Sequence, residues 1–263
     1  MVTNSIYKDV YLICWRELRN FTLRENIHRI VSMKKIFVIL SFLILSGCQT
    51  TGLMSGIDKD WDVGFYDNCG LPKDTLKTIE EDGNKFLRFQ LKSGQKGLCQ
   101  SDRKKRSGAD FWERSELKQS NHLDRNNIYE IDFKVRFIDG FKARHETFFQ
   151  IHQSRNGCRG KPLVMLKVRR GFLGHFTINI DDFKGNWINF KMILNLVDMS
   201  YALYIDDKLI QERPITRRIN GCSRPHIKFG IYRGGYYRSD GSLVPNDTSI
   251  IDFDDMKVKK LNP

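Results

Sequence analysis

Short runs of alternating or β-rich residues recur along most of this chain, with turn signals such as Asp139-Gly140 and Lys184-Gly185-Asn186 between them. No long segment has a persuasive 3.6-residue apolar period, although residues 74–82 could form one short helix. This number of strands in roughly 200 residues predicts an all-β fold, a concanavalin-like β-jelly-roll sandwich with a concave groove. The runs cover residues 86–91, 111–117, 129–138, 147–152, 163–168, 175–180, 187–196, 201–205, 226–233 and 250–258.

The N-terminal part of the chain has a different pattern. Met33-Lys-Lys precedes a mostly apolar run at 36–45, and Leu45-Ser-Gly-Cys48 follows. A basic start, an apolar core and small residues before a cysteine resemble a bacterial lipoprotein signal. We therefore expect residues 1–32 to be an upstream extension from a misplaced start codon and residues 33–47 to be a signal peptide. The alternative is a membrane helix over 30–45, but spanning normally requires about 20 apolar residues.

Cleavage before Cys48 would leave that cysteine lipidated. Residues 48–62, which are polar and contain glycine, would then form a tether, and residues 63–263 would form the folded domain. On this interpretation the protein is a bacterial lipoprotein, a monomer anchored to the membrane by its lipid alone. It would lie in the periplasm or at the cell surface.

The charge of the chain favours an anionic partner. The full chain carries a formal net charge of +13, and residues 1–47 hold seven Lys/Arg against three Asp/Glu, so the remainder keeps about +9. Nucleic acid is the obvious rival partner, but the sequence has no recognised DNA- or RNA-binding motif and carries the export signal. An anionic polysaccharide fits both observations better. We expect no cofactor, and the sequence shows no cluster of metal ligands.

The cysteines that remain after processing are Cys69, Cys99, Cys158 and Cys222, an even number in an oxidising compartment. Four cysteines allow three disulfide connectivities, and the sequence alone does not choose among them. We favour Cys69–Cys99 with Cys158–Cys222, because the second pair would tie the loop after residue 152 to the loop before residue 226. A zinc site is disfavoured because no paired CxxC spacing is present.

Three short segments far apart in the chain place polar side chains at alternate positions. They are Arg114-Ser-Glu116-Leu-Lys118, Gln150-Ile-His152 and Lys228-Phe-Gly-Ile-Tyr232. Successive side chains of a strand point to opposite faces, so each segment has one polar face and one apolar face. We expect the three strands to converge on one sugar, with their apolar residues in the core. Those apolar residues are Leu117, Phe149, Ile151, Phe229 and Ile231.

These polar residues suit removal of a proton next to a carboxylate. In a uronic-acid polymer a base can take the C5 proton, and the C4–O4 bond then breaks to leave an unsaturated sugar. That proton is weakly acidic while the neighbouring carboxylate keeps its charge, so the protein must neutralise or hydrogen-bond the group. Arg114 can do this with its planar fork and Gln150 with its amide. The same donors would stabilise the enolate-like transition state preferentially.

A base and an acid are also required. His152 titrates in the right range. Tyr232 can serve as the acid, or as the base if the neighbouring cations Lys228 and Arg233 lower its pKa.

At these segments the chain resembles the jelly-roll polysaccharide lyases. Arg114-Ser-Glu-Leu-Lys118 is similar to the Arg-Thr/Ser-Glu-Leu/Val-Arg motif of alginate lyases, Gln150-Ile-His152 matches their Gln-Ile/Val-His, and Lys228-Phe-Gly-Ile-Tyr232 resembles their Lys-Ala-Gly-x-Tyr. Glucuronan lyases and the heparin lyase I group share the scaffold and the last two patterns. The resemblance implies β-elimination on a uronate-containing polysaccharide. It implies that Arg114 and Gln150 neutralise the carboxylate, that His152 is the base or a carboxylate contact, and that Tyr232 protonates O4.

The chain also departs from the alginate-lyase pattern. Tyr232 is followed by Arg233-Gly-Gly-Tyr-Tyr-Arg238 instead of Asn-Gln, and Lys118 replaces the last arginine of the first motif. These departures favour the glucuronan and heparin-lyase-like branch over alginate. We expect the substrate-binding residues to be Lys228, Lys118, Arg233, Tyr236 and Arg238.

Two features near these motifs are open to structural interpretations. Glu116 is expected to orient Arg114 by a salt bridge, since a free carboxylate would repel the substrate. The basic run Arg103-Lys-Lys-Arg106 is either a loop over the groove or a solvated turn.

Two rival functions use the same fold. A jelly-roll glycoside hydrolase needs two carboxylates on one strand, and Glu130-Ile-Asp132-Phe-Lys134 has lysine where the last carboxylate of the signature should stand. A non-catalytic carbohydrate-binding surface lipoprotein would keep basic and aromatic residues but would not need His152 together with Tyr232.

Overall fold

A computed structural model of the protein describes residues 64–67, 69–153, 160–174, 178–219, 221 and 224–261. All of these lie in Met54–Pro263, one of the two units into which the chain divides. The expected signal peptide, the lipidation site Cys48 and the tether lie outside the described residues, as do Cys158 and Cys222. Across the described ranges, no helix is long and apolar enough to cross a membrane.

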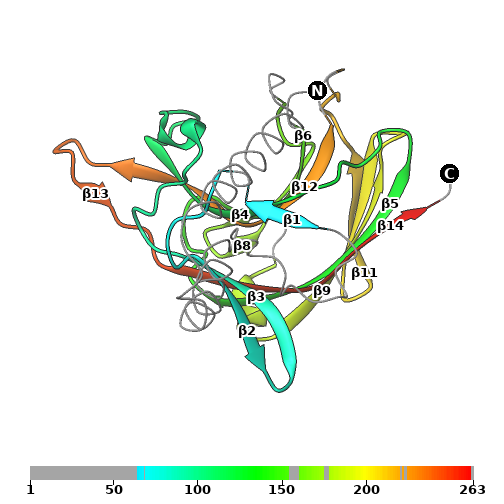
Figure 1. Ribbon diagram of the computed structural model, residues 1–263, viewed down its shortest axis with the longest axis horizontal. Coiled ribbons are helices and arrows are strands. Elements are labelled where there is room, and N and C mark those ends of the chain that lie inside the picture. Colours follow the sequence, from blue (N-terminus) through cyan, green and yellow to red (C-terminus); the bar gives the residue numbers. More distant parts are fainter. Residues whose placement is uncertain are drawn as a thin grey trace, which may run out of the picture. The chain divides into compact units, whose positions relative to one another are not determined.

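The described residues form strands and two short 3-10 helices (Figure 1). The 3-10 helices are η2 (Gln100–Arg103) and η3 (Ile180–Phe183). The strands are β1 (Phe65–Asp67), β2 (Leu76–Glu81), β3 (Asn84–Leu91), β4 (Phe111–Gln119), β5 (Ile128–Asp139), β6 (Glu146–Gln153), β7 (Val164–Arg169), β8 (Phe172–Leu173), β9 (Trp187–Asn195), β10 (Ser200–Ile205), β11 (Lys208–Pro214), β12 (Pro225–Tyr237), β13 (Leu243–Val244) and β14 (Ser249–Leu261).

The strands make two antiparallel sheets. The first has the order β1-β4-β12-β6-β7-β8, with β13 paired to β12, and the second has the order β11-β10-β9-β5-β14-β3-β2. Neighbours in the sheets are often distant in sequence, as β4 and β12 are, so long connections cross between the layers. The expected jelly-roll sandwich is confirmed.

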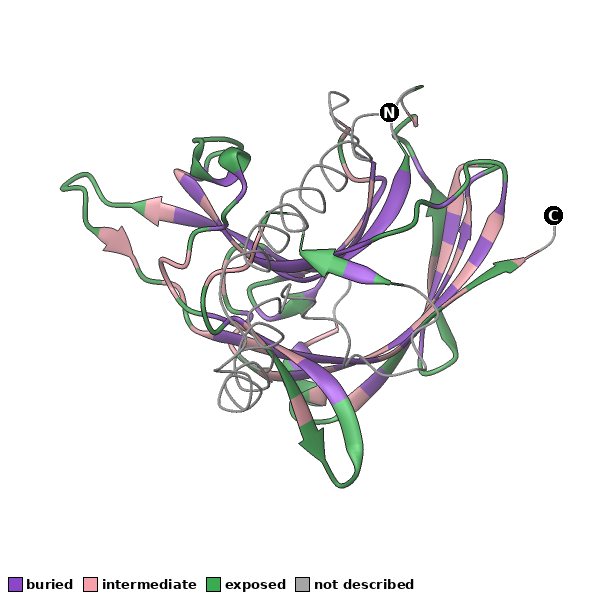
Figure 2. Ribbon diagram, in the orientation of Figure 1, coloured by how far each residue is buried: buried purple, intermediate pink, exposed green. Residues whose placement is uncertain are grey.

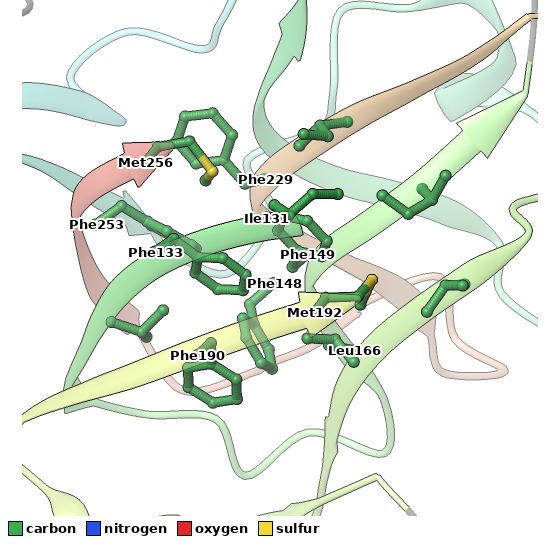
Figure 3. Packing of buried hydrophobic residues seen from close by; sticks show 14 of the residues in the cluster. Ile131, Phe133, Phe148, Phe149, Leu166, Phe190, Met192, Phe229, Phe253 and Met256 are labelled. Atoms are coloured by element: carbon green, nitrogen blue, oxygen red, sulfur yellow. The ribbon is translucent and has the colours of Figure 1, made fainter. Parts of the chain in front are cut away.

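Aromatic side chains join the two sheets (Figure 3). The ring of Phe149 on β6 stacks on Phe133 of β5 with centroids 4.5 Å apart. Phe229 on β12 meets Phe253 of β14 at 5.0 Å. These residues are fully buried, and burying such rings supplies much of the stability of a sandwich.

Nine of the ten expected runs correspond to strands, and the ends differ by up to four residues, the largest difference being at the end of β12. The tenth, 175–180, lies partly outside the described residues, and its described end leads into η3. The helix considered for 74–82 is wrong, because this segment contains strand β2. Asp82 and Gly83, with φ angles of 53° and 78°, form the tight turn into β3, and an Asp-Gly pair is a strong hairpin signal.

The strands that carry the three motifs are buried on both faces, whereas β5 and β10 alternate between buried and partly exposed residues (Figure 2). Apolar residues that pack in the core account for the burial of only one face of β12. Its other face holds the polar residues of the motifs, so segments outside the sheet must cover them.

Candidate active site

The expected site residues lie on three adjacent strands of the first sheet. On β12, Tyr232 is opposite Arg114 of β4, and Lys228 is opposite Lys118. On the other side of β12, Lys228 is opposite Gln150 of β6. Directly opposed residues point to the same face of a sheet, so these side chains form one cluster.

An irregularity in β6 adjusts which of its residues face the cluster. The pairing of β6 with β7 shifts between Thr147 and Phe149, and its pairing with β12 shifts between Phe229 and Tyr232. As a result, both Phe148 and Phe149 are fully buried, and Thr147 is opposite Tyr232. A regular strand would have brought Phe148 to the polar face.

Arg114 is held by two carboxylates. Its Nη2 donates to Oδ1 of Asp102 at 2.8 Å, and its Nε lies 3.6 Å from Oε2 of Glu116. Gln150 donates from Nε2 to Oε1 of Glu116 at 2.6 Å. The ion pair expected between Glu116 and Arg114 is therefore present, and Asp102 of η2 adds a second one. Burial raises the pKa of Asp102, and the charge of Arg114 opposes that shift.

Tyr232 is enclosed by an indole ring and two guanidinium groups. Trp112 stacks on its ring at a centroid distance of 4.7 Å, and the guanidinium carbon of Arg114 lies 4.6 Å from the ring centroid. Arg106 donates from Nη2 to the hydroxyl oxygen of Tyr232. Burial raises the pKa of Tyr232 to about 12, and the charges of Arg114 and Arg106 oppose the rise. Tyr232 is therefore a neutral phenol at neutral pH.

His152 is also neutral in this site. Burial, followed by the charges of Lys228, His226, Arg114 and Lys118, lowers its pKa to about 2. Its ring lies 5.5 Å from that of His226, which is fully buried. Burial also lowers the pKa of His226 to about 3, and that of Lys228 to about 8.

A disulfide between Cys69 and Cys99 lies at the edge of the cluster, with the two Cα atoms 5.0 Å apart. This half of the expected pairing is confirmed, and the other half, Cys158–Cys222, lies outside the described residues. The disulfide and Gly70 line a small hollow together with Arg114, Glu116, Lys118 and Lys228. The segment that contains η2 thus covers the face of β4.

Arg233 is not in this cluster, so its expected role as a substrate contact is wrong. Its side chain is only 1% exposed and pairs with Glu113 and Glu146. Arg233 follows Tyr232 directly, and successive residues of a strand face opposite ways. Because Arg233 faces away from the hydroxyl of Tyr232, it is not the cation that acts on this tyrosine. The cations beside Tyr232 are Arg114 and Arg106.

The remaining expected contacts lie further along β12. Tyr236 is half-buried near the end of the strand, where it pairs with Val244 of β13, and Arg238 is exposed just beyond it. Four residues along a strand span about 13 Å, so Tyr236 and Tyr232 are too far apart to contact the same sugar.

Four residues near the motifs were not expected from the sequence, namely Asp102, Arg106, Trp112 and His226. Only Arg106 has a signal in the sequence, because it belongs to the basic run 103–106, for which the sequence predicts either a loop over the groove or a solvated turn. The rival hydrolase pair, Glu130 and Asp132, lies on β5 of the other sheet. No group of three or more His, Cys, Asp or Glu side chains that could hold a metal ion occurs among the described residues.

No family model and no curated protein matches the sequence. Solved structures with the same fold include an endo-β-1,4-glucuronan lyase from the fungus Trichoderma reesei, at 15% identity and a TM-score of 0.52, covering 78% of this chain and 91% of that one. They also include a variant of the family 7 alginate lyase A1-II′ in complex with substrate, at 14% identity and a TM-score of 0.51, covering 74% of this chain and 84% of that one. The chain has the β-jelly-roll sandwich fold of these polysaccharide lyases.

Proposed function

We propose that the protein is a polysaccharide lyase that cleaves a uronate-containing anionic polysaccharide by β-elimination. The observation that carries the proposal is the meeting of neutral His152 and neutral Tyr232 on one face with Arg114, Lys228 and Gln150. An uncharged imidazole can accept a proton, and a phenol can give one.

The charges of the cluster favour an anionic substrate. Its cations, Arg106, Arg114, Lys118 and Lys228, outnumber the two carboxylates, Asp102 and Glu116. Burial lowers the pKa of His152 most and the positive charges lower it further, so a uronate carboxylate that neutralises part of this charge would raise the pKa again in part.

In the proposed reaction, His152 takes the C5 proton and the electron pair of that bond forms the C4–C5 double bond. The C4–O4 bond breaks, and Tyr232 gives its proton to O4. Lys228, Lys118 and Arg114 hold the carboxylate, whose negative charge grows as C5 loses its proton. Where the C5 proton and O4 lie on the same side of the ring, Tyr232 could perform both transfers only as the tyrosinate, which would take the C5 proton and give it to O4, and His152 would be a carboxylate contact.

The choice among uronate polymers rests on the named lyases with this fold and on the residues that follow Tyr232. The structures with this fold include lyases named for glucuronan and for alginate. The residues after Tyr232 depart from the alginate-lyase motif, so we propose glucuronan or a heparin-like chain ahead of alginate.

The test is incubation of the full-length chain with glucuronan, alginate, a heparin-like chain and a neutral β-glucan. Ultraviolet absorbance of the unsaturated product and new reducing ends are measured together. A lyase gives both signals on a uronate polymer, a hydrolase gives reducing ends alone, and a carbohydrate-binding protein gives neither.

Tyr232→Phe tests the assignment of the acid. The substitution keeps the stacked ring and removes the hydroxyl, so we expect the melting temperature to change little and kcat to fall by roughly 10² to 10⁴. Tyr204→Phe, on β10 of the other sheet, is the matched control and should keep full activity. Activity of Tyr232→Phe within a few-fold of the unmodified protein refutes the assignment.

A further inference from the structure

A second cavity lies away from the cluster around Tyr232, at the side of the sandwich formed by β7, β10 and β11. Its volume is about 310 Å³, within the lower range of small-ligand sites. One part of the lining includes residues 162–167 and Arg169, with His145, Leu173 and Gly174. The other part consists of Tyr201 and Leu203 of β10, Gln211 and Arg213 of β11, and the segment 214–217.

Polar residues take inward positions on one wall of this cavity. Gln211 and Arg213 are opposite Leu203 and Tyr201, which are buried, and so they share the inner face of the second sheet. On β9 of the same sheet, inward positions hold fully buried Phe190 and Met192. The first sheet ends at β7 and the two-residue β8, so Gln211 and Arg213 line a cavity there instead of a core.

The lining is strongly cationic. Lys167, Arg169, Arg213 and Arg217 contribute to it, and the described lining residues include no Asp or Glu. Within the described part of the chain, none of these four cations forms an ion pair with a carboxylate. Burial and the nearby charge of Arg217 lower the pKa of Lys167, so the cavity concentrates positive charge with no counterion among the described residues that line it.

Hydrogen bonds hold two of the arginines in place. Arg217 donates from Nη1 to the carbonyl oxygen of Pro162 at 2.6 Å, which ties the segment after β11 to the segment before β7. Arg213 donates from Nε to the hydroxyl of Tyr201 at 2.9 Å. Among the described residues, both Nη groups of Arg213 are left for a ligand, and fixed donors lose less entropy when a ligand binds.

We propose that this cavity binds a carboxylate-bearing sugar, with the carboxylate at Lys167 and Arg217 and one face of the sugar ring on Tyr201 and Ile215. A sugar acid combines an apolar ring face, hydroxyl groups and a negative charge, and the lining offers a partner for each. Lys167 is opposite Thr147, which is opposite Tyr232, so the site lies two strands from the candidate acid. The proposal stands whether or not Tyr232 is catalytic.

The test is NMR spectroscopy of the full-length chain labelled with methyl-¹³C methionine. Met165 lines the cavity, and the fully buried Met192 and Met256 report whether each variant keeps its fold. We titrate with diglucuronate, with neutral cellobiose and with inorganic phosphate. Diglucuronate should shift the Met165 signal saturably, whereas cellobiose and phosphate should bind at least tenfold more weakly.

Variants locate the response. Arg217→Gln and Lys167→Gln should raise the dissociation constant for diglucuronate roughly tenfold or more, since each removes a charge-assisted contact. Arg218→Gln, the exposed neighbour that does not line the cavity, should leave it unchanged. Because Met165 is also opposite Gln150, Lys118→Gln in the candidate active site is tested and should leave the Met165 response intact.

Four results would overturn the proposal. Equal binding of cellobiose would exclude recognition of charge, and equal binding of phosphate would reduce the cavity to a general anion site. An unchanged dissociation constant in both Arg217→Gln and Lys167→Gln would place the ligand elsewhere. Loss of the Met165 response in Lys118→Gln would assign it to the candidate active site.

Discussion

At the scale of single residues, the hydrogen bond from Arg106 determines what Tyr232 can do. A guanidinium group can only donate, so the hydroxyl oxygen of Tyr232 is the acceptor. The hydrogen of the phenol is then left to point elsewhere, and in the proposed reaction it points to O4. The two nearby guanidinium groups also favour the tyrosinate that remains after the proton leaves.

Arg106→Gln tests this positioning. We expect kcat to fall roughly 10- to 100-fold, the effect of losing one hydrogen bond to a charged group, while KM changes by less. Arg103→Gln, also exposed in the same basic run, should have little effect on kcat. Steady-state kinetics on the preferred polymer measure both constants. A rise in KM with unchanged kcat would show that Arg106 only binds the polymer.

Lys228 should give the reaction an alkaline limit. Its pKa of about 8 means that it is charged below that pH and loses its charge above it. We expect kcat/KM, which reports the free protein, to fall as the pH rises through about 8. The bound carboxylate favours the charged amine, so kcat should fall only at higher pH. Lys228→Gln should lower kcat/KM at pH 7 and abolish its fall above about pH 8. If kcat/KM of Lys228→Gln still falls as the pH rises through about 8, another group causes the alkaline limit.

The sequence could predict which residues share the cluster but not all of their partners. Strand alternation alone relates Arg114 to Glu116, Gln150 to His152 and Lys228 to Tyr232. Asp102 and Arg106 escaped prediction because they come from a segment whose path depends on tertiary packing. The charge of Arg233 suggests a substrate contact, but its position directly after Tyr232 places its side chain on the other face of the strand.

At the scale of elements, β12 brings the motifs together because it lies between β4 and β6. Its Gly230, with φ of 130°, allows this close approach, since an added Cβ would lie 2.2 Å from the carbonyl oxygen of Ser115. The hydrophobic pattern predicted nine strand segments well. It could not predict the order of the strands, because that order depends on pairing between residues more than 100 positions apart.

The Cys69–Cys99 disulfide anchors the segment that carries η2, because the helix begins directly after Cys99. The two cysteines are 30 positions apart, and closing a loop of this size stabilises a protein by about 3–4 kcal/mol in the chain-entropy description. The variant with both Cys69→Ala and Cys99→Ala should lose that free energy of unfolding in urea. It should also raise KM, since Asp102 would hold Arg114 less firmly. A reducing agent should destabilise the unmodified protein much more than this variant.

At the scale of the whole sandwich, a buried ionic cluster joins the two sheets. Arg233 of β12 contacts Glu113 of β4 and Glu146 of β6 in the first sheet. It also donates to the hydroxyl of Ser249 on β14 at 2.8 Å and to the carbonyl oxygen of Leu91 on β3 at 3.3 Å, both in the second sheet. The aromatic core fills the middle of the sandwich, and the ionic cluster around Arg233 adds hydrogen bonds and ion pairs that connect the two sheets.

Arg233→Met should therefore be among the most destabilising single changes in the domain. The methionine would occupy much of the volume, but Glu113 and Glu146, both fully buried, would lose their counterion. Breaking a buried ion pair by removing one partner costs about 3–5 kcal/mol, and we expect that loss in the free energy of unfolding measured with urea. Arg238→Met, at an exposed position, is the matched control and should change stability by less than about 0.5 kcal/mol. Adding Glu113→Gln to Arg233→Met should recover part of the loss, because it removes one of the two uncompensated charges. Without such a recovery, the destabilisation would come from packing instead of from the buried carboxylates.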